Sequence, residues 1–418
     1  MKILHFILKI LAKLVLSKYH PQVIAITGSV GKTSTKEAVY SILVNKFRVE
    51  KSIKNYNNEI GLPLTIFNKE SGQKNIFKWL AIFLFVFKIL IFRKKDYPKV
   101  LILEMAADQP GDINYLTSLA KPDRAIITTI GYSHLESFGS LQNIIKEKGS
   151  ILNRLTKDDY AFLNEDDKEV LKFKGRTKAK VRTFGQSKEA DIYISHIKIS
   201  TKDNTIGMSF KLNNKVSEIP IFLPNVLGWQ HAQAAAAATA VGLSLGMNLV
   251  EIGKSLRNYK PAPGRTNLIK GIKHTYLIDD TYNSAPQSSF LALEILKDFP
   301  REGRKIVVLG DMLELGKLTE EGHRSVGKKV KELKIDYLFT IGERTRDIAR
   351  GAQEAGFSKD KIFSFPFNKE AGLFLQERLK ENDIVLIKGS RGMKMEEIVY
   401  EIMAEPWKAN ELLVSKVK

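Results

Sequence analysis

A short glycine loop near the start of the chain constrains the fold most. Residues 27–34 read Thr-Gly-Ser-Val-Gly-Lys-Thr-Ser, directly after the apolar run 23–26 and directly before a stretch with a helical pattern. A strand that leads through glycines into a helix presents backbone N–H groups to an anion, and the Lys-Thr pair can add charge and a Mg²⁺ ligand. The loop therefore predicts a phosphate-binding unit of a nucleotide triphosphatase. Its candidate nucleotide ligands are Gly28, Ser29, Gly31, Lys32, Thr33 and Ser34.

The spacing of this loop is shorter than the full Walker form, because the first glycine is Gly28 and position 26 is an isoleucine. Taken alone, the loop therefore leaves a second interpretation open. It could be an ordinary strand–turn–helix connection in which glycine serves only the tight geometry.

Composition narrows the class of protein. With 418 residues, 44% of them hydrophobic, the chain is long enough for roughly two to three domains with large cores. It contains no cysteine, which excludes disulfides, thiolate metal sites and thiol nucleophiles, and with them cysteine redox chemistry. The absence of cysteine fits a reducing compartment, and we expect a cytoplasmic protein.

The formal net charge of +20 indicates an anionic partner, and nucleic acid, a phosphorylated substrate or an acidic membrane surface would each provide one. The lysines are scattered, with no basic stripe interleaved with aromatic residues, so we expect no nucleic-acid binding. A solvated surface is the simpler explanation for charge of this kind.

The first sixteen residues predict a basic amphipathic helix. They are almost wholly apolar, and at about 100° per residue the polar positions fall on one narrow face. Those positions are Lys2, His5, Lys9 and Lys13. No small-residue cleavage site follows before residues 19–21, so we expect no cleaved signal peptide.

A second apolar segment, residues 76–92, is about as hydrophobic as a membrane-spanning helix. It lies at the short end of the spanning range and contains Lys78 and Lys88. Trp79 near one end and the basic residues 93–95 at the other favour a helix in a lipid interface or packed on protein over a spanning one. The choice between lipid and protein contact stays open.

Beyond the loop, residues 99–103 and 125–130 read as buried strands, each followed by a polar turn. Ligands in open α/β sheets bind at the carboxyl ends of strands. Glu104 ends the first strand and His134 follows the second, so both are candidate Mg²⁺ ligands, directly or through water. The alternative is that Glu104 caps a helix and His134 is a surface turn residue.

Lys146 and Lys148 lie on a predicted helix over residues 141–155. By themselves they read as solvated lysines.

The remaining chain predicts more sheet and a second α/β unit. Residues 160–225 carry short alternating runs typical of edge strands that complete a mixed sheet, and an alanine-rich helix follows. From about residue 262, apolar strands and helices alternate again. The expected strands are 275–278, 305–309, 337–341 and 384–387.

The predicted fold class is therefore α/β: a P-loop central ATPase domain with a mostly parallel sheet, followed by a Rossmann-like C-terminal domain. We expect an N-terminal helix over 1–20, a central domain over 21–261 with a hydrophobic insertion at about 72–96, and a C-terminal domain over 262–418.

Seven ordered blocks carry a specific resemblance to a known family. The first four are residues 27–34, 57–65 (Asn-Asn-Glu-Ile-Gly-Leu-Pro-Leu-Thr), 103–105 (Leu-Glu-Met) and 134–140 (His-Leu-Glu-Ser-Phe-Gly-Ser). The others are residues 280–283 (Asp-Thr-Tyr-Asn), 310–316 (Gly-Asp-Met-Leu-Glu-Leu-Gly) and 388–391 (Lys-Gly-Ser-Arg). Together they resemble the Mur ligase family from about residue 21 to about residue 400. The last three blocks resemble the branch that adds D-alanyl-D-alanine.

The resemblance implies an ATP-dependent, ADP-forming amide ligase of peptidoglycan precursor synthesis. Such an enzyme joins D-alanyl-D-alanine to the carboxylate of a muramyl tripeptide through an acyl phosphate, with ATP and Mg²⁺. The chemistry needs positioning and charge neutralisation, which the loop, Lys32 and Mg²⁺ could supply.

The resemblance also implies roles for individual residues. Thr33, Glu104 and His134 would hold Mg²⁺, with His134 on a second ion. Lys148 aligns best with a lysine that many members carry as a carbamate, and Lys146 is the second choice. The catalytic set would be Lys32, His134 and Lys148. Arg265 and Asp280 would contact the nucleotide, and the substrate peptides would contact Asn58, Asn283, Lys388, Ser390 and Arg391.

Three departures from the family pattern stand out. Members typically begin with a separate domain that grips the UDP-sugar, whereas about twenty residues precede the first strand here. Gln230-His231 replaces the usual His-Asn pair, and Ala106 replaces a usual glycine. We therefore hypothesise that the two apolar helices dock the protein on an anionic membrane surface, at the inner face of the cell membrane. How the acyl donor is anchored stays open.

Two alternative functions remain at this point. One is a related Mur-type or folylpolyglutamate-synthase-like ligase with another acyl donor, against which blocks 280–283 and 310–312 argue. The other is a non-catalytic, membrane-associated scaffold. A scaffold would need none of the expected catalytic and metal-binding residues. Their presence argues against this alternative; they are Lys32, Thr33, Glu104, His134 and Lys148.

Overall fold

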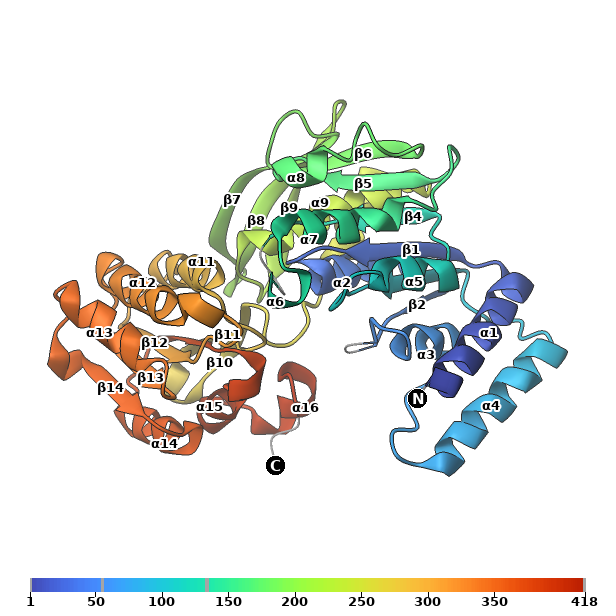
Figure 1. The fold of residues 1–418 in the computed structure, drawn as a ribbon. Coiled ribbons are helices and arrows are strands. Elements are labelled where there is room, and N and C mark those ends of the chain that lie inside the picture. Colours follow the sequence, from blue (N-terminus) through green and yellow to red (C-terminus); the bar gives the residue numbers. More distant parts are fainter. Residues whose placement is uncertain (1, 54–55, 132–134, 416–418) are drawn as a thin grey trace. The chain divides into compact units, whose positions relative to one another are not determined.

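The computed structural model describes residues 2–53, 56–131 and 135–415 (Figure 1). The chain divides into two compact units, and it passes between them more than once. The first unit comprises Met1–His196, Phe210–Ile221 and Ala232–Lys260, and the second comprises Ile197–Ser209, Phe222–His231 and Pro261–Lys418. The division into residues 1–20, 21–261 and 262–418 stays a prediction.

A nine-stranded sheet in the order β2-β3-β1-β4-β5-β6-β7-β8-β9 organises the first half of the chain. Its strands are β1 (Gln22–Thr27), β2 (Val49–Lys51), β3 (Val100–Glu104), β4 (Arg124–Ile127), β5 (Tyr160–Asn164), β6 (Lys180–Gly185), β7 (Ile192–Lys202), β8 (Thr205–Asn213) and β9 (Glu218–Pro224). The pairs from β2 to β7 are parallel. Because β1 lies between β3 and β4, the loop after β1 meets the carboxyl ends of both neighbours.

Helices pack around this sheet. They are α1 (Lys2–Tyr19), α2 (Lys32–Leu43), α3 (Gly61–Phe67), α4 (Ile76–Ile91), α5 (Asp112–Leu119), α6 (Leu135–Phe138), α7 (Leu141–Gly149), α8 (Lys168–Leu171), α9 (Trp229–Ser244) and α10 (Leu249–Leu256). The alanines of α9 are almost all buried, since small side chains let neighbouring elements approach closely. One core cluster joins the strands of this sheet to α1, α4, α5 and α7.

The predicted N-terminal helix is present as α1, and its apolar residues meet two different surroundings. Leu8, Leu11 and Val15 of α1 are buried in the core of the first unit, whereas Phe6 and Leu14 on another face are exposed. The helix therefore has two apolar faces, one of them internal. Along the described stretches of the chain, no helix combines the length and the hydropathy that crossing a bilayer requires.

The second unit holds a six-stranded sheet in the order β10-β11-β15-β12-β13-β14. Its strands are β10 (Asn267–Lys270), β11 (Tyr276–Asp280), β12 (Lys305–Gly310), β13 (Tyr337–Ile341), β14 (Ile362–Phe365) and β15 (Ile384–Lys388). All pairs are parallel except β10 with β11. The helices are α11 (Pro286–Lys297), α12 (Thr319–Glu332), α13 (Arg346–Glu354), α14 (Asn368–Arg378), α15 (Glu396–Ile402) and α16 (Ala409–Leu412). Two hydrophobic clusters cover the two faces of the sheet.

The α/β fold class is confirmed, with three local corrections. The predicted strand over 125–130 ends at Ile127, and the predicted helix over 141–155 ends at Gly149 and continues as a short 3-10 turn. Strands β2, β10 and β14 were not predicted.

Candidate functional site

The glycine loop after β1 has the backbone geometry of an anion cradle. Gly28 and Gly31 have φ values of 147° and 90°, a region that side chains other than glycine rarely adopt. A Cβ at Gly28 would also run into the Thr128 side chain and the Thr129 backbone. Gly31 immediately precedes α2 without a side-chain cap, so the first backbone N–H groups of the helix remain available for an anion.

Hydrogen bonds to the end of β4 hold the loop in place. Ser29 donates its backbone N–H to the Thr129 carbonyl at 2.8 Å, and its hydroxyl contacts both the carbonyl and the N–H of Gly131. The Val30 N–H donates to Thr129 Oγ1 at 3.0 Å. The loop is therefore preorganised by its neighbouring strand.

Lys32 folds back over this loop. Its Nζ donates to the carbonyls of Gly28 at 2.7 Å and Ser29 at 3.2 Å. The ammonium group thus lies at the loop itself, where it would add positive charge next to a bound phosphate.

Thr33 and Glu104 meet at the first turn of α2. Thr33 Oγ1 lies 3.2 and 3.1 Å from the two carboxylate oxygens of Glu104. The parallel register of β1 and β3, which pairs Ile26 with Glu104, brings them together. Mg²⁺ commonly takes one or two protein oxygens and completes its shell with water and phosphate oxygens, so this pair fits that ion.

No group of three histidine or acidic side chains forms a metal site within the described ranges. His134, predicted as a metal ligand, lies outside the described residues. Thr33 and Glu104 are the predicted ligands that the structure brings together.

Lys36 is a member of this site that sequence reasoning missed. Its side chain is buried, and Nζ lies 3.4 Å from Glu104 Oε2 and 3.7 Å from Glu37 Oε1. It therefore compensates the buried charge of Glu104. Its position three residues after Thr33 places both side chains on one helix face, a signal that was available from the sequence.

Lys148 is buried on α7, whereas Lys146 is exposed. Burial, together with the positive charge of Lys32, lowers the pKa of Lys148 to about 7. Glu147, which lies between them in the sequence, points to the start of α5, where its carboxylate accepts hydrogen bonds from Gly111 N and Ile113 N at 2.7 Å each. Of the two candidate lysines, Lys148 is the buried one, and its pKa is the one that the charge of Lys32 lowers.

In the second unit, three predicted blocks meet at the carboxyl ends of β11, β12 and β15. Lys388 is buried and donates to Asp280 Oδ2 at 2.6 Å and to the Asn283 carbonyl at 2.8 Å. Ser390 Oγ accepts from Leu313 N at 2.8 Å. These contacts tie residues 280–283 and 310–316 to residues 388–391.

Three predicted substrate residues have internal partners. Arg391 pairs with buried Glu396 at 2.8 and 3.0 Å. Asn58 Oδ1 accepts from the N–H of Gly61, the first residue of α3, at 2.9 Å. Asn283 is exposed, and its Oδ1 accepts from Ser284 N at 2.9 Å. Each contact orders a loop, and the substrate roles stay predictions.

Arg265 has the features of a ligand-binding side chain. Its guanidinium lies 3.9 Å from the centre of the Tyr282 ring, while its buried Nε has no hydrogen-bond partner among the described residues. A buried donor without a partner is unfavourable. An acceptor on a bound ligand would satisfy it.

His231, which stands in the family's usual Asn position, is fully buried. Its Nε2 lies 2.8 Å from the Arg265 carbonyl, so this nitrogen carries the proton and donates. Burial lowers the pKa of His231 to about 4, so the ring is neutral near pH 7.

Asp279 and His323 are two further positioning residues that the sequence did not reveal. Buried Asp279 accepts from Gly264 N and from Thr281, and burial raises its pKa to about 7. His323 accepts from Met312 N at 3.0 Å and donates from Nδ1 to the Thr319 carbonyl at 2.6 Å. Both order loops next to predicted blocks.

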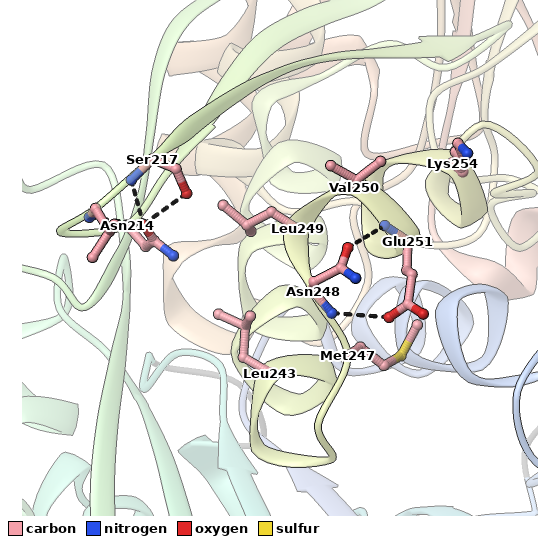
Figure 2. Close-up of a pocket in the computed structure, with 10 residues that line it drawn as sticks. Asn214, Ser217, Leu243, Met247, Asn248, Leu249, Val250, Glu251 and Lys254 are labelled. Atoms are coloured by element: carbon pink, nitrogen blue, oxygen red, sulfur yellow. Dashed lines mark hydrogen bonds between the residues drawn. The ribbon is translucent and has the colours of Figure 1, made fainter.

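A separate cavity of about 710 Å³ lies beside the turn between β8 and β9 and the α9–α10 segment. Figure 2 shows Asn248 and Glu251 in this cavity, bonded to each other at the start of α10. None of the predicted site residues lines it. It is therefore not the phosphate site.

Comparisons with known proteins agree on one family. The model for the Mur ligase middle domain matches residues 26–77 and 86–242, and that for the Mur ligase, glutamate ligase domain matches residues 264–391. The UDP-N-acetylmuramoyl-tripeptide--D-alanyl-D-alanine ligase of Bacillus subtilis (strain 168) is 33% identical over 396 residues, covering 95% of this chain and 79% of that protein.

Two solved structures are similar over almost the whole chain. A crystal structure of MurF from Acinetobacter baumannii has a TM-score of 0.78 at 27% identity and covers 95% of this chain and 80% of that one. MurF ligase from Thermotoga maritima in complex with ADP has a TM-score of 0.77 at 28% identity and covers 95% and 83%.

Proposed function

The chain belongs to the Mur ligase family, and from this membership we propose that it is an ATP-dependent, ADP-forming ligase that joins D-alanyl-D-alanine to a muramyl tripeptide. The proposed role is in peptidoglycan precursor synthesis, as the names of its relatives indicate. The observation that carries the proposal is the phosphate loop with Lys32 folded over it and Thr33 bonded to Glu104.

The proposed reaction has two steps. A carboxylate oxygen of the tripeptide attacks the γ-phosphorus of ATP, the bond to the β-phosphate oxygen breaks, and an acyl phosphate and ADP result. The amine of D-alanyl-D-alanine then attacks the acyl carbon through a tetrahedral intermediate, loses a proton and releases phosphate. The loop N–H groups and Lys32 stabilise the charge that moves during phosphoryl transfer.

We propose that Thr33 and Glu104 hold Mg²⁺, with His134 as a ligand of a second ion. Bound there, Mg²⁺ would neutralise phosphate charge and orient the transferring group. Lys36 supports this role, because its buried ammonium balances the Glu104 carboxylate and fixes its position.

We further propose that Lys148 reacts with carbon dioxide to form a carbamate. Its neutral amine would form an N–C bond to carbon dioxide and lose one proton, which converts a cation into an anion beside Lys32. The pKa of about 7 supports this assignment, since a substantial fraction of the amine is neutral at physiological pH.

Residues of the second unit, together with Asn58 of the first unit, are proposed as ligands of the substrates. Arg265, with its unpartnered Nε, and Asp280 would contact the nucleotide. The substrate peptides would contact Asn58, Asn283, Lys388, Ser390 and Arg391. The loop bonds of Lys388 and Ser390 support a preorganised peptide site.

We propose that the reaction takes place in the cytoplasm, where ATP is available. We propose in addition that the ligase works at the inner face of the cell membrane, since α1 and α4 both expose large apolar side chains.

Mass spectrometry of the products tests the proposed function. The full chain is incubated with ATP, Mg²⁺, D-alanyl-D-alanine and UDP-linked muramyl tripeptides. We expect a pentapeptide product and ADP release that depends on both peptide substrates. Lys148→Ala should lower the rate by about 10²-fold or more, while Lys146→Ala at the exposed neighbour should leave it nearly unchanged.

Other outcomes would contradict the proposal. Product formation with pteroyl-glutamate in place of the muramyl peptide would identify a folylpolyglutamate-synthase-like ligase. No ADP release with any acyl acceptor would favour a scaffold. Equal losses for the two lysine variants would refute the assignment of Lys148.

A further inference from the structure

Helix α4 exposes one continuous apolar face. Leu80, Leu84, Phe87 and Ile91 recur at helical spacing, and Phe77 at the start of the helix is 78% exposed. The opposite face is held by the core, where Ile82, Val86 and Ile89 are buried. The helix is thus fixed to the protein on one side and apolar toward solvent on the other.

Helix α1 extends this surface. Phe6, Ile7, Ile10 and Leu14 are all exposed on the side away from its buried residues. We refer to these residues and the exposed apolar residues of α4 together as the α1–α4 face. Exposed apolar side chains in such number on two adjacent helices mark an interaction site.

The two helices form one fixed element, side by side in Figure 1. At their C-terminal ends, Lys18 Nζ donates to the Leu90 carbonyl at 2.7 Å, and the Tyr19 hydroxyl donates to the Ile89 carbonyl at 2.8 Å. The Tyr19 ring also stacks on Tyr97 at 4.1 Å. Neither α1 nor residues 78–85 of α4 fall within the matched Mur ligase middle domain.

A basic cavity of about 900 Å³ opens where these helices end. Six of its lining residues are cationic, and no lining residue is acidic. The cationic ones are Arg48, Arg93, Lys94, Lys95, Lys99 and Arg124.

The hydrogen bonds from the cationic side chains of this cavity go to neutral groups, although Asp123 and Asp159 interact electrostatically with Arg124, and Glu50 does so with Lys94. Arg124 is held by neutral groups, Gln22 Oε1 and Ser244 Oγ, at 3.0 Å each. Arg48 donates to the Lys95 carbonyl. Among the described residues, the ion pair at this cavity joins Lys94 to Asp96 at 4.0 Å, and Asp96 is largely exposed.

We propose that the α1–α4 face lies in the interface of an anionic bilayer and that the basic cavity binds the phosphate of a lipid headgroup. Helix α4 has 16 residues, fewer than the roughly 20 that span a bilayer, so it lies along the membrane plane. Apolar insertion and basic headgroup contact are the two terms that hold such helices on membranes.

Charge favours lipid over a second copy of this chain as the occupant. The chain carries a formal net charge of +20, so two copies repel each other as they approach, because like charges repel. Anionic headgroups supply the opposite sign. This inference rests on the proposed membrane location and is independent of the ligase chemistry.

Vesicle flotation of the full chain tests the inference. Vesicles of phosphatidylcholine with about 30% phosphatidylglycerol should bind the protein at least about tenfold more strongly than phosphatidylcholine alone, and salt should weaken the binding. Two double variants separate the contribution of apolar insertion from that of headgroup binding. Leu84→Glu with Phe87→Glu changes the apolar face, and Arg93→Glu with Lys95→Glu changes the basic cavity. Each should reduce binding about tenfold or more.

Val216→Glu is the matched control, because Val216 is 91% exposed and lies outside the α1–α4 face; its binding should equal that of the wild type. ADP formation measured without vesicles should persist in all variants, which separates loss of docking from loss of ligase function or folding. Unchanged binding of either double variant, or equal binding to uncharged vesicles, would overturn the inference. So would a dimer in solution that the apolar variant converts to a monomer.

Discussion

At the scale of single residues, Lys148 ties stability to pH. Its pKa is about 7 in the folded protein and near 10.4 in an unfolded chain. Between these values the unfolded state binds more protons, so the contribution of Lys148 to the free energy of unfolding rises with pH. Below pH 7 both states are protonated and the contribution is constant.

We therefore expect the Tm of the wild type, relative to that of Lys148→Met, to increase from about pH 7 to about pH 9 in buffer free of carbon dioxide. Differential scanning calorimetry measures it. Lys146→Met, at the exposed neighbour, should run parallel to the wild type. If the Tm of Lys148→Met also changed with pH in parallel with that of the wild type, the Lys148 amine would not be desolvated.

The site residues that the sequence revealed are those fixed by local pattern. Lys32 and Thr33 follow from the loop itself, and Glu104 follows from its place at the end of a strand. Lys36 was missed although its helical spacing from Thr33 could be seen, because its partner Glu104 is distant in sequence. Asp279 and His323 were missed because their burial is not visible in the sequence. For His231 the sequence showed a departure from the family, and the structure shows a buried ring that bonds to backbone.

At the scale of elements, α1 combines a structural face with an exposed one. Leu8 is 0% exposed and Leu14 is 49% exposed on the same helix. Leu8→Ala should lower the free energy of unfolding by about 2–4 kcal/mol, because it leaves a cavity in the core. Leu14→Ala should change it by less than about 0.5 kcal/mol. Urea denaturation checks both, and equal effects would mean that α1 does not belong to the core.

Strands were predictable where they are buried on both faces and therefore read as unbroken apolar runs, as in β1, β3 and β12. The edge strands β10 and β14 are short and partly exposed, which weakens that signal. The two faces of α1 were beyond the sequence, since periodicity cannot tell an apolar face that meets the core from one that meets solvent.

At the scale of the whole molecule, nucleotide binding should appear as stabilisation. At a hundredfold excess over its Kd, ATP with Mg²⁺ should stabilise the folded chain by about 2.7 kcal/mol. Thermal unfolding with and without ATP measures this as a rise in Tm. EDTA should reduce the rise, and Lys32→Met should abolish it. A rise that survives both changes would place the nucleotide away from the glycine loop.

The passage of the chain between its two units affects how it is made. Residues 197–209 and 222–231 pack with the segment that begins at Pro261, and Ile206 and Leu227 share a cluster with Ile278 and Leu386. During synthesis these apolar side chains emerge well before their partners. At translation rates of about 5–20 residues per second, Ile206 waits roughly 9 to 36 s for Leu386. The ribosome-bound chain is thus most exposed to aggregation in this interval.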